Sequence, residues 1–190
     1  VGFPEIIKTS IKYFNTVSNT WINFFLKNYR NKGVFWFLKL FKTYSIFGIS
    51  PKIINTNKLD SFSPRIFTFS TLSHPTIPLH SLLIRGHQEK FNKLSCKTYL
   101  NGKLINQTTI LNGPFVLNFP VSAKGETNHF KLLFNKSFNY ENNEVSTFIT
   151  DILPLSEEEY RFFLEYRKST KNATNWINQH LKSTPDFSLY

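Results

Sequence analysis

Tyr99-Leu100-Asn101-Gly102-Lys103-Leu104 is the clearest local signal in the sequence, because it places an Asn-Gly pair between two strand-like segments. Asn and Gly tolerate the positive φ angles of a type I′ turn, whose twist suits a tight antiparallel hairpin. The sequence therefore predicts a β-hairpin with its turn at Asn101 and Gly102.

Other strand-like segments lie on both sides of this hairpin. They are 66–70, 82–84, 94–100, 115–119, 129–134 and 147–153. Turn residues separate them, including Asn112-Gly113-Pro114, and no helical segment interrupts them. This succession of short strands is typical of an antiparallel sandwich. We therefore predict a mainly β fold, an antiparallel β-sandwich of about seven strands over residues 65–155.

The sequence before the strands is predicted to form a basic, aromatic helical hairpin over residues 1–49. Apolar residues recur at helical spacing over 4–29, and a second, shorter helix is expected over 34–44. The Pro- and Ser-rich segment 50–64 breaks this pattern. It is predicted to be a linker that lies along the surface.

A C-terminal helix and the start of a following segment are predicted over residues 156–190. Ser156-Glu157-Glu158-Glu159 has the form of a capping box, in which the hydroxyl and the third carboxylate accept hydrogen bonds from free backbone N–H groups. At the far end, Pro185–Tyr190 is typical of the beginning of a strand, and the sequence contains no methionine. We therefore expect the chain to be a piece of a longer protein.

The chain is strongly basic, and its positive charge is unevenly distributed. The net charge is +11, of which residues 1–50 carry +6, residues 51–155 carry +5, and residues 156–190 carry none. This excess favours anionic partners such as phosphate or anionic lipid. A solvated surface, on a piece of a protein whose remainder is acidic, is the alternative explanation.

One cluster is predicted to form a membrane or partner surface. It combines Trp36 with four surrounding cations: Arg30, Lys32, Lys39 and Lys42. The rings of Phe35, Phe37 and Phe41 lie in the same segment. Rings beside cations suit a membrane interface, because the rings enter the headgroup zone while the cations meet anionic lipid. Packing of the aromatic face on a neighbouring domain is the alternative, and nucleic acid is a third.

The sequence predicts no catalytic residues, no cofactor and no metal site. The single cysteine, Cys96, excludes an internal disulfide and a cysteine-based zinc site, and we expect an inert buried thiol. The five histidines are scattered singly, without the i,i+4 pairing of a helical metal site. The seven glycines are dispersed, which leaves no glycine-rich phosphate loop.

Three phrases follow one another in the β segment: Lys97-Thr-Tyr-Leu-Asn-Gly-Lys-Leu-Ile105, Gly113-Pro-Phe-Val-Leu-Asn-Phe-Pro120 and Phe130-Lys-Leu-Leu-Phe-Asn-Lys-Ser-Phe138. Together they resemble an accessory β-sandwich module of large bacterial multi-domain glycosyltransferases. The phrase Pro185–Tyr190 resembles the approach to the family 2 glycosyltransferase domain of those proteins. Asn139–Ser146 departs from the family, where a loop with Pro and Asp or Arg is usual.

This resemblance implies a non-catalytic accessory or scaffolding module of a glycan-synthesising enzyme. The nucleotide-sugar site and the metal-binding motif would lie beyond Tyr190, so the implied partners are a downstream catalytic domain or neighbouring subunits. The module itself would position the enzyme, dock on an anionic membrane surface, or contact glycan through exposed aromatics such as Tyr99 or Tyr140.

A basic structural subunit of a large RNA-containing or mitochondrial membrane assembly is the second hypothesis. Lys97, Lys103 and Lys131 could line a sheet surface, and aromatic side chains can stack on bases. No apolar run approaches the roughly 20 residues of a membrane span, and no segment resembles a signal peptide. We expect a cytoplasmic location, peripheral at the membrane if the aromatic surface contacts lipid, with a mitochondrial location under the second hypothesis.

Overall fold

The computed structural model describes residues 2–14, 17–121 and 126–183. The chain divides into two compact units. Residues 1–49 and 157–190 form the helical unit, and residues 50–156 form the β unit. The N-terminal and C-terminal helices, expected as separate segments, therefore share one unit. Each unit is described by itself, and the predicted strand at 185–190 lies outside the described residues.

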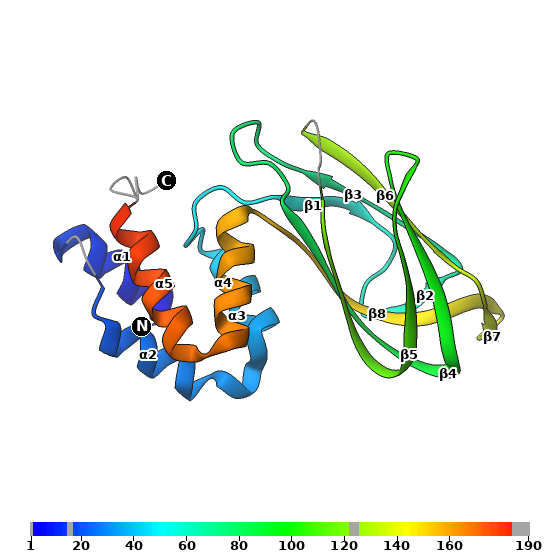
Figure 1. The fold of residues 1–190 in the computed structure, drawn as a ribbon, viewed down its shortest axis with the longest axis horizontal. Helices are drawn as coiled ribbons and strands as arrows, with labels where there is room; N and C mark the ends of the chain where they lie inside the picture. Colours follow the sequence, from blue (N-terminus) through cyan, green and yellow to red (C-terminus); the bar gives the residue numbers. More distant parts are fainter. Residues whose placement is uncertain (1, 15–16, 122–125, 184–190) are drawn as a thin grey trace. The chain divides into compact units, whose positions relative to one another are not determined.

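The β unit contains one antiparallel sheet of eight strands, which confirms the mainly β, antiparallel fold class. The strands are β1 (Lys52–Thr56), β2 (Ser61–Pro64), β3 (Ile66–Leu72), β4 (Ser81–Leu100), β5 (Lys103–Pro120), β6 (Thr127–Phe134), β7 (Phe138–Tyr140) and β8 (Asn143–Leu155). Their order across the sheet is β1-β3-β6-β4-β8-β2, with β5 paired to β4 and β7 paired to β8. Figure 1 labels each of them.

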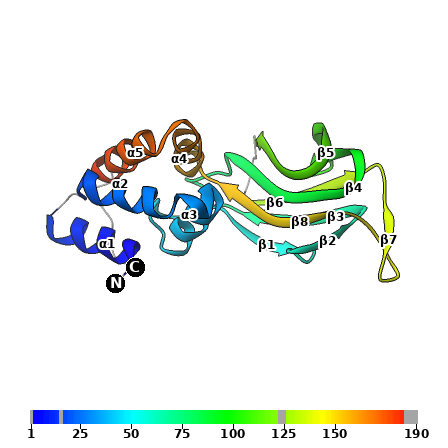
Figure 2. The ribbon, with the colours of Figure 1, turned by 90° about the horizontal axis from the view of Figure 1, so that it is seen from below.

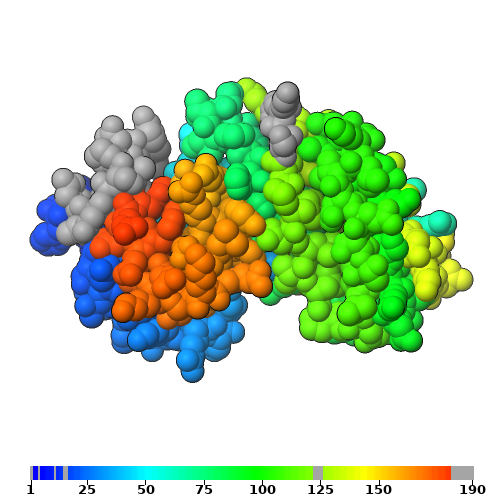
Figure 3. Space-filling model, in the orientation of Figure 1, coloured from blue at the N-terminus to red at the C-terminus, as the bar shows by residue number. Residues whose placement is uncertain are grey.

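Two long strands, β4 and β5, extend through both of the layers that the sheet forms (Figure 1). The segments 82–84 and 94–100, predicted as separate strands, are the two ends of β4. The turn predicted at Asn112-Gly113-Pro114 is wrong, because β5 passes straight through it. A bulge opposite this point, over residues 89–92 of β4, takes up the extra length. Figure 3 shows the two strands covering one face of the β unit.

At this bulge, side-chain hydrogen bonds take the place of the backbone hydrogen bonds between the two strands. The Gln88 carboxamide is buried, and its Oε1 accepts hydrogen bonds from the backbone N–H groups of Lys90 (2.9 Å) and Phe91 (3.4 Å). From the other strand, Asn112 Nδ2 donates to the carbonyl of Glu89 at 3.0 Å. Bulges bend a strand and increase its twist. The strand pair can therefore curve around the core while these three backbone groups keep hydrogen-bond partners.

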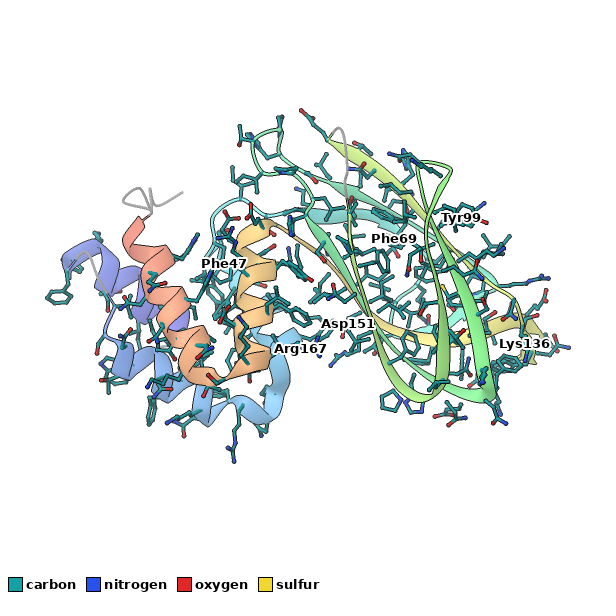
Figure 4. The ribbon with its side chains drawn as sticks, viewed as in Figure 1. Phe47, Phe69, Tyr99, Lys136, Asp151 and Arg167 are labelled. Atoms are coloured by element: carbon teal, nitrogen blue, oxygen red, sulfur yellow. The ribbon has the colours of Figure 1, made fainter. Side chains whose placement is uncertain are left out.

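The curvature closes the sheet around an interior. One edge of β4 pairs with β5, while its other edge pairs with β8 over 81–87 and with β6 over 96–100. The sheet thus splits into two layers, and Figure 2 shows β1 and β2 on the opposite side of the β unit from β4 and β5. The core between them contains Phe67, Phe69, Leu82, Ile84, Leu94, Cys96, Leu117, Phe119, Phe130, Leu132, Phe134 and Ile149. Figure 4 shows Phe69 in this interior.

The linker predicted over residues 50–64 is wrong, since this segment supplies two strands. β1 pairs with β3, and β2 pairs with β8. Both stand at the ends of the strand order, where only one edge is bonded. Pro64 ends β2, and proline is tolerated at such edge positions. The Pro- and Ser-rich composition therefore reflects edge strands rather than a connection.

The Asn-Gly hairpin is confirmed. Leu100 pairs with Lys103, and the φ angles of Asn101 and Gly102 are 48° and 83°. Asn101 also reaches the start of β6, because its Oδ1 accepts a hydrogen bond from the backbone N–H of His129 at 2.8 Å. The turn therefore positions a third strand as well as joining two.

Substitution in this turn is expected to destabilise the β unit. Gly102→Val places a β-branched side chain at positive φ, which costs about 1–2 kcal/mol. Asn101→Ala places a residue without a local hydrogen-bonding group at positive φ and also removes the bond to His129. Thermal melting followed by circular dichroism measures both effects, and unchanged melting of both variants would refute the role of the turn.

The helical unit contains α1 (Phe3–Phe14), α2 (Asn19–Asn28), the short 3₁₀ helix η1 (Arg30–Lys32), α3 (Gly33–Thr43), α4 (Glu157–Lys168) and α5 (Thr170–Ser183). The single helix predicted over 4–29 is wrong. Ser18 restarts the helix, because its Oγ accepts a hydrogen bond from the N–H of Thr20 at 3.3 Å, as an N-cap residue does. The apolar spacing continues through the break, which explains why it suggested one helix.

Candidate functional site

The structure places the predicted surface residues in different environments. Arg30 and Lys32 lie exposed in η1, and Lys39 lies exposed on α3. Trp36 is half-buried, and its ring stacks on Tyr29 with 5.5 Å between centroids. Trp36 is thus committed to contacts inside the helical unit.

Lys42, the fifth of these residues, points into the helical unit. Its Nζ lies 3.0 Å from Glu159 Oε2, and the side chains are 17% and 1% exposed. Burial lowers the pKa of Lys42, and the charge and hydrogen bond of Glu159 oppose that shift. The carboxylate of Glu159, which was expected to cap α4, therefore accepts a hydrogen bond from Lys42 on α3. The sequence could not show this, because the partners are 117 residues apart.

The other aromatic residues of α3 form the core of the helical unit. Phe35, Phe37 and Phe41 are buried. The ring of Phe37 lies 5.4 Å from that of Tyr166, and the ring of Phe41 lies 5.1 Å from that of Phe162. Phe37 and Phe41 therefore pack against α4, which belongs to the other end of the chain. Figure 4 labels Phe47, which joins the same cluster through Phe41 and Phe162.

A candidate ligand site lies in the β unit, between β2, β7 and β8. It is a pocket of about 640 Å³. Its lining consists of Lys58, Ser61, Phe62, Pro64, Tyr140, Glu141, Asn143, Glu144, Val145 and Phe148. We call it the Tyr140 pocket. The segment predicted as a linker supplies four of these residues, so the sequence suggested Tyr140 but not the pocket around it.

Aromatic rings form the apolar part of the Tyr140 pocket. Phe62 on β2 lies opposite Phe148 on β8, and their rings meet edge to face with 5.4 Å between centroids. The ring of Tyr140 lies 4.6 Å from that of Phe62 at an angle of 46°. Tyr140 is 43% exposed. Two half-buried rings thus support a third that is open to solvent.

A tight turn places polar groups beside these rings. Glu141 and Asn142 join β7 to β8 with φ angles of 47° and 64°. The Asn143 amide donates to the carbonyl of Glu141 at 3.1 Å, and the hydroxyl of Ser137 donates to Glu144 Oε1. The negative charge of Glu141 and the hydrogen bond that its carboxylate accepts from the phenol raise the pKa of Tyr140. The phenol therefore keeps its proton and donates it to Glu141.

A second pocket, of about 410 Å³, surrounds Tyr99 on the outer face of β3, β6 and β4. Lys131 Nζ lies over the Tyr99 ring, 4.6 Å from its centroid. Ser70 Oγ lies 2.8 Å from His129 Nδ1. Figure 4 labels Tyr99 near the β4–β5 hairpin. An ammonium group already covers one face of this ring, whereas Tyr140 has no such cover among the described residues.

Two further reactive groups of the β unit are buried. Asp151 is buried and forms an ion pair with Arg85, its cross-strand neighbour. Burial raises the pKa of the Cys96 thiol to about 12, in keeping with the inert thiol expected from the sequence. Within 2–14, 17–121 and 126–183, no group of three or more His, Cys, Asp or Glu could hold a metal ion.

None of the helices that the structure describes is both long enough and apolar enough to cross a membrane.

Comparison with known proteins gives only distant likenesses. No protein-family model matches the sequence, and no curated protein matches it significantly. A family 35 carbohydrate-binding module from an environmental isolate is 15% identical, with 53% of this chain and 69% of that chain covered and a TM-score of 0.37. The CBM36-1 domain of a multidomain xylanase from the hindgut metagenome of Trinervitermes trinervoides is 10% identical, with 56% and 90% covered and a TM-score of 0.36.

An acetyl xylan esterase from the rumen bacterium Butyrivibrio proteoclasticus is 14% identical, with 58% of this chain and 30% of that chain covered and a TM-score of 0.37. At these identities and TM-scores, the function of this chain has to be inferred from its own residues.

Proposed function

We propose that the β unit is a non-catalytic glycan-contact module and that the Tyr140 pocket is its sugar-binding site. The observation that carries this proposal is an exposed tyrosine ring next to carboxylates and an amide in a pocket of about 640 Å³. Sugar rings present C–H groups on their faces and hydroxyl groups around their edges. A binding site for them needs an apolar platform with hydrogen-bonding groups at its side.

The Tyr140 pocket supplies both parts. The exposed ring of Tyr140, supported by Phe62, offers the platform. Glu141 and Glu144 accept hydrogen bonds from hydroxyl groups, while the Asn143 amide and the Lys58 ammonium group can donate. Such a combination of apolar surface with a few placed polar groups is the usual form of a small-ligand site.

Removing the Tyr140 ring is expected to abolish most glycan binding. Tyr140→Ala should weaken binding roughly tenfold, or about 1.4 kcal/mol, because it removes the platform on which the face of the sugar packs. Because the ring is exposed, the variant should fold normally. A glycan array identifies the ligand, and titration calorimetry with the best binder gives the affinity of each variant.

Tyr99→Ala is the matched control, because it removes the other tyrosine ring named for glycan contact. Its affinity should equal that of the unaltered chain. The proposal fails if no glycan binds, or if Tyr140→Ala leaves the affinity unchanged.

The wider context that we propose is a glycan-synthesising enzyme, with this chain as its accessory module. The order of the sequence phrases over 97–138 supports that context. A gene that continues from the codon for Tyr190 into a transferase domain would agree with it, and a stop codon directly after Tyr190 would contradict it.

Binding of single-stranded RNA is the second candidate function, and the Tyr99 pocket favours it. Lys131 lies beside Tyr99 across the β4–β6 pair, and Lys97 lies two residues before Tyr99 on β4. A ring flanked by lysines on an open sheet face is what base stacking with phosphate contacts requires. Under this function, RNA affinity falls steeply with salt and is lost in Tyr99→Ala, whereas Tyr140→Ala has no effect.

A further inference from the structure

The helical unit exposes four large aromatic rings close together along the chain. Tyr13 and Phe14 end α1, and Trp21 and Phe24 lie in the first half of α2. Their exposed fractions are 68%, 73%, 54% and 59%. Single exposed apolar residues are ordinary, but a group of large rings marks an interaction site. We call these four residues the aromatic corner. Its rings are not those of the predicted surface around Trp36.

The outward side of α2 shows how the aromatic corner is built. Ile22, Phe25 and Leu26 are buried, so the inward side of this helix is already packed. Trp21 and Phe24 are three residues apart and therefore share the other side. Their rings meet edge to face, with 6.2 Å between centroids. About half of each of these two side chains therefore stays open to solvent.

The sequence that follows Glu5 carries charge of one sign up to Asp60. Between Glu5 and Asp60 the sequence has no acidic residue and nine Lys or Arg. Lys12 Nζ lies over the Tyr13 ring, 5.4 Å from its centroid, and Lys27 and Arg30 lie exposed on and just after α2. The partner that complements these groups is therefore negatively charged as well as apolar.

We infer that the aromatic corner is a peripheral contact site for an anionic lipid surface. Trp and Tyr rings suit the headgroup level, and the Phe rings, which have no hydrogen-bonding group, suit the boundary with the acyl chains. Lys12, Lys27 and Arg30 then meet the lipid phosphates. This site is independent of the Tyr140 pocket, and it would hold the chain at a membrane without spanning it.

The test is flotation of the whole chain with vesicles. We expect binding to phosphatidylcholine vesicles that contain phosphatidylserine, and little binding to phosphatidylcholine alone. The double variant Trp21→Ala/Phe24→Ala should lower the partition coefficient about tenfold or more, because the inserted rings supply the apolar part of binding. Lys27→Gln should lower it roughly fivefold, with a smaller dependence on salt.

Leu111→Ala is the matched control, since Leu111 is a 61% exposed apolar residue of the β unit. It should leave the partition coefficient unchanged, and so should Tyr140→Ala. The inference is overturned if the vesicles do not bind the chain. It is also overturned if the double variant binds them as the unaltered chain does, or if RNA or a second copy of the chain occupies the corner instead. Loss of vesicle binding in the double variant with intact glycan binding would separate this site from the proposed function.

Discussion

Replacing Glu159 with alanine is expected to destabilise the helical unit by about 3–5 kcal/mol, the cost of leaving one member of a buried ion pair without its counter-charge. Glu159 is 1% exposed, and it accepts the hydrogen bond of Lys42 Nζ at 3.0 Å. Without the carboxylate, the ammonium group either stays buried with this counter-charge removed or releases its proton. Both alternatives favour the unfolded chain.

All three tryptophans, Trp21, Trp36 and Trp176, belong to the helical unit, so tryptophan fluorescence during urea unfolding reports on this unit alone. The control is the double variant Lys42→Met/Glu159→Leu. It should recover most of the lost stability, because replacing both charges with apolar groups is often neutral. A loss below about 1 kcal/mol in Glu159→Ala would show that Lys42 reaches solvent.

The same pair gives the helical unit a pH dependence of known sign. Burial lowers the pKa of Lys42 below its usual 10.5. Between the lowered value and 10.5, the unfolded chain binds a proton that the folded chain does not bind. The free energy of unfolding contributed by this group therefore rises with pH across that window. In Glu159→Ala the opposing effect of the carboxylate is gone, so the rise should begin at a lower pH.

Replacing Gly86 with alanine is expected to destabilise the β unit by about 3 kcal/mol or more, because there is no room for a methyl group. A Cβ at this position would lie 2.2 Å from the carbonyl oxygen of Phe148 and 2.4 Å from Cζ of Phe115. The ring could turn away, but the carbonyl belongs to the adjacent strand β8. Gly86 thus allows β4 to lie between β5 and β8 where the register shifts.

Cys96 can measure this effect, because it is the single thiol of the chain and lies buried in the β core. Its alkylation rate should rise in Gly86→Ala as the β unit opens more often. Gly102→Ala is the matched control, since a Cβ there meets nothing within 4 Å and the cost is only that of positive φ. Adding Phe115→Leu should not rescue Gly86→Ala. If it does, the ring and not the carbonyl limits the space.

Local signals predicted local structure in this chain, and the errors came from partners distant in sequence. Asn101 and Gly102 determine a turn by their own backbone preferences, so the hairpin was predictable. The continuity of β4 and β5 was not, because it depends on a bulge that one strand forms opposite the other. The break between α1 and α2 left the apolar spacing unchanged, so periodicity could not reveal it.

The candidate sites show the same contrast between features set by neighbouring residues and features set by partners distant in sequence. Tyr140 was named as an exposed aromatic residue, but its pocket depends on β2, whose composition suggested a linker. The surface around Trp36 was inferred from neighbours in sequence, whereas Lys42 turns inward toward Glu159 and Trp36 toward Tyr29. The exposed rings of Trp21 and Phe24 fitted the same helical spacing as the buried ones. Their exposure follows from the packing of α2.

The helical unit is built from both sides of the β unit in sequence, with α4 and α5 contributed after residue 156. The β unit is therefore an insertion in the helical unit. During synthesis, α1, α2 and α3 leave the ribosome more than a hundred residues before α4. Until α4 arrives, Phe37 and Phe41 lack the rings of Tyr166 and Phe162, and Lys42 lacks its carboxylate. The helical unit thus completes its core after the β unit has been synthesised, and until then these rings are exposed to aggregation.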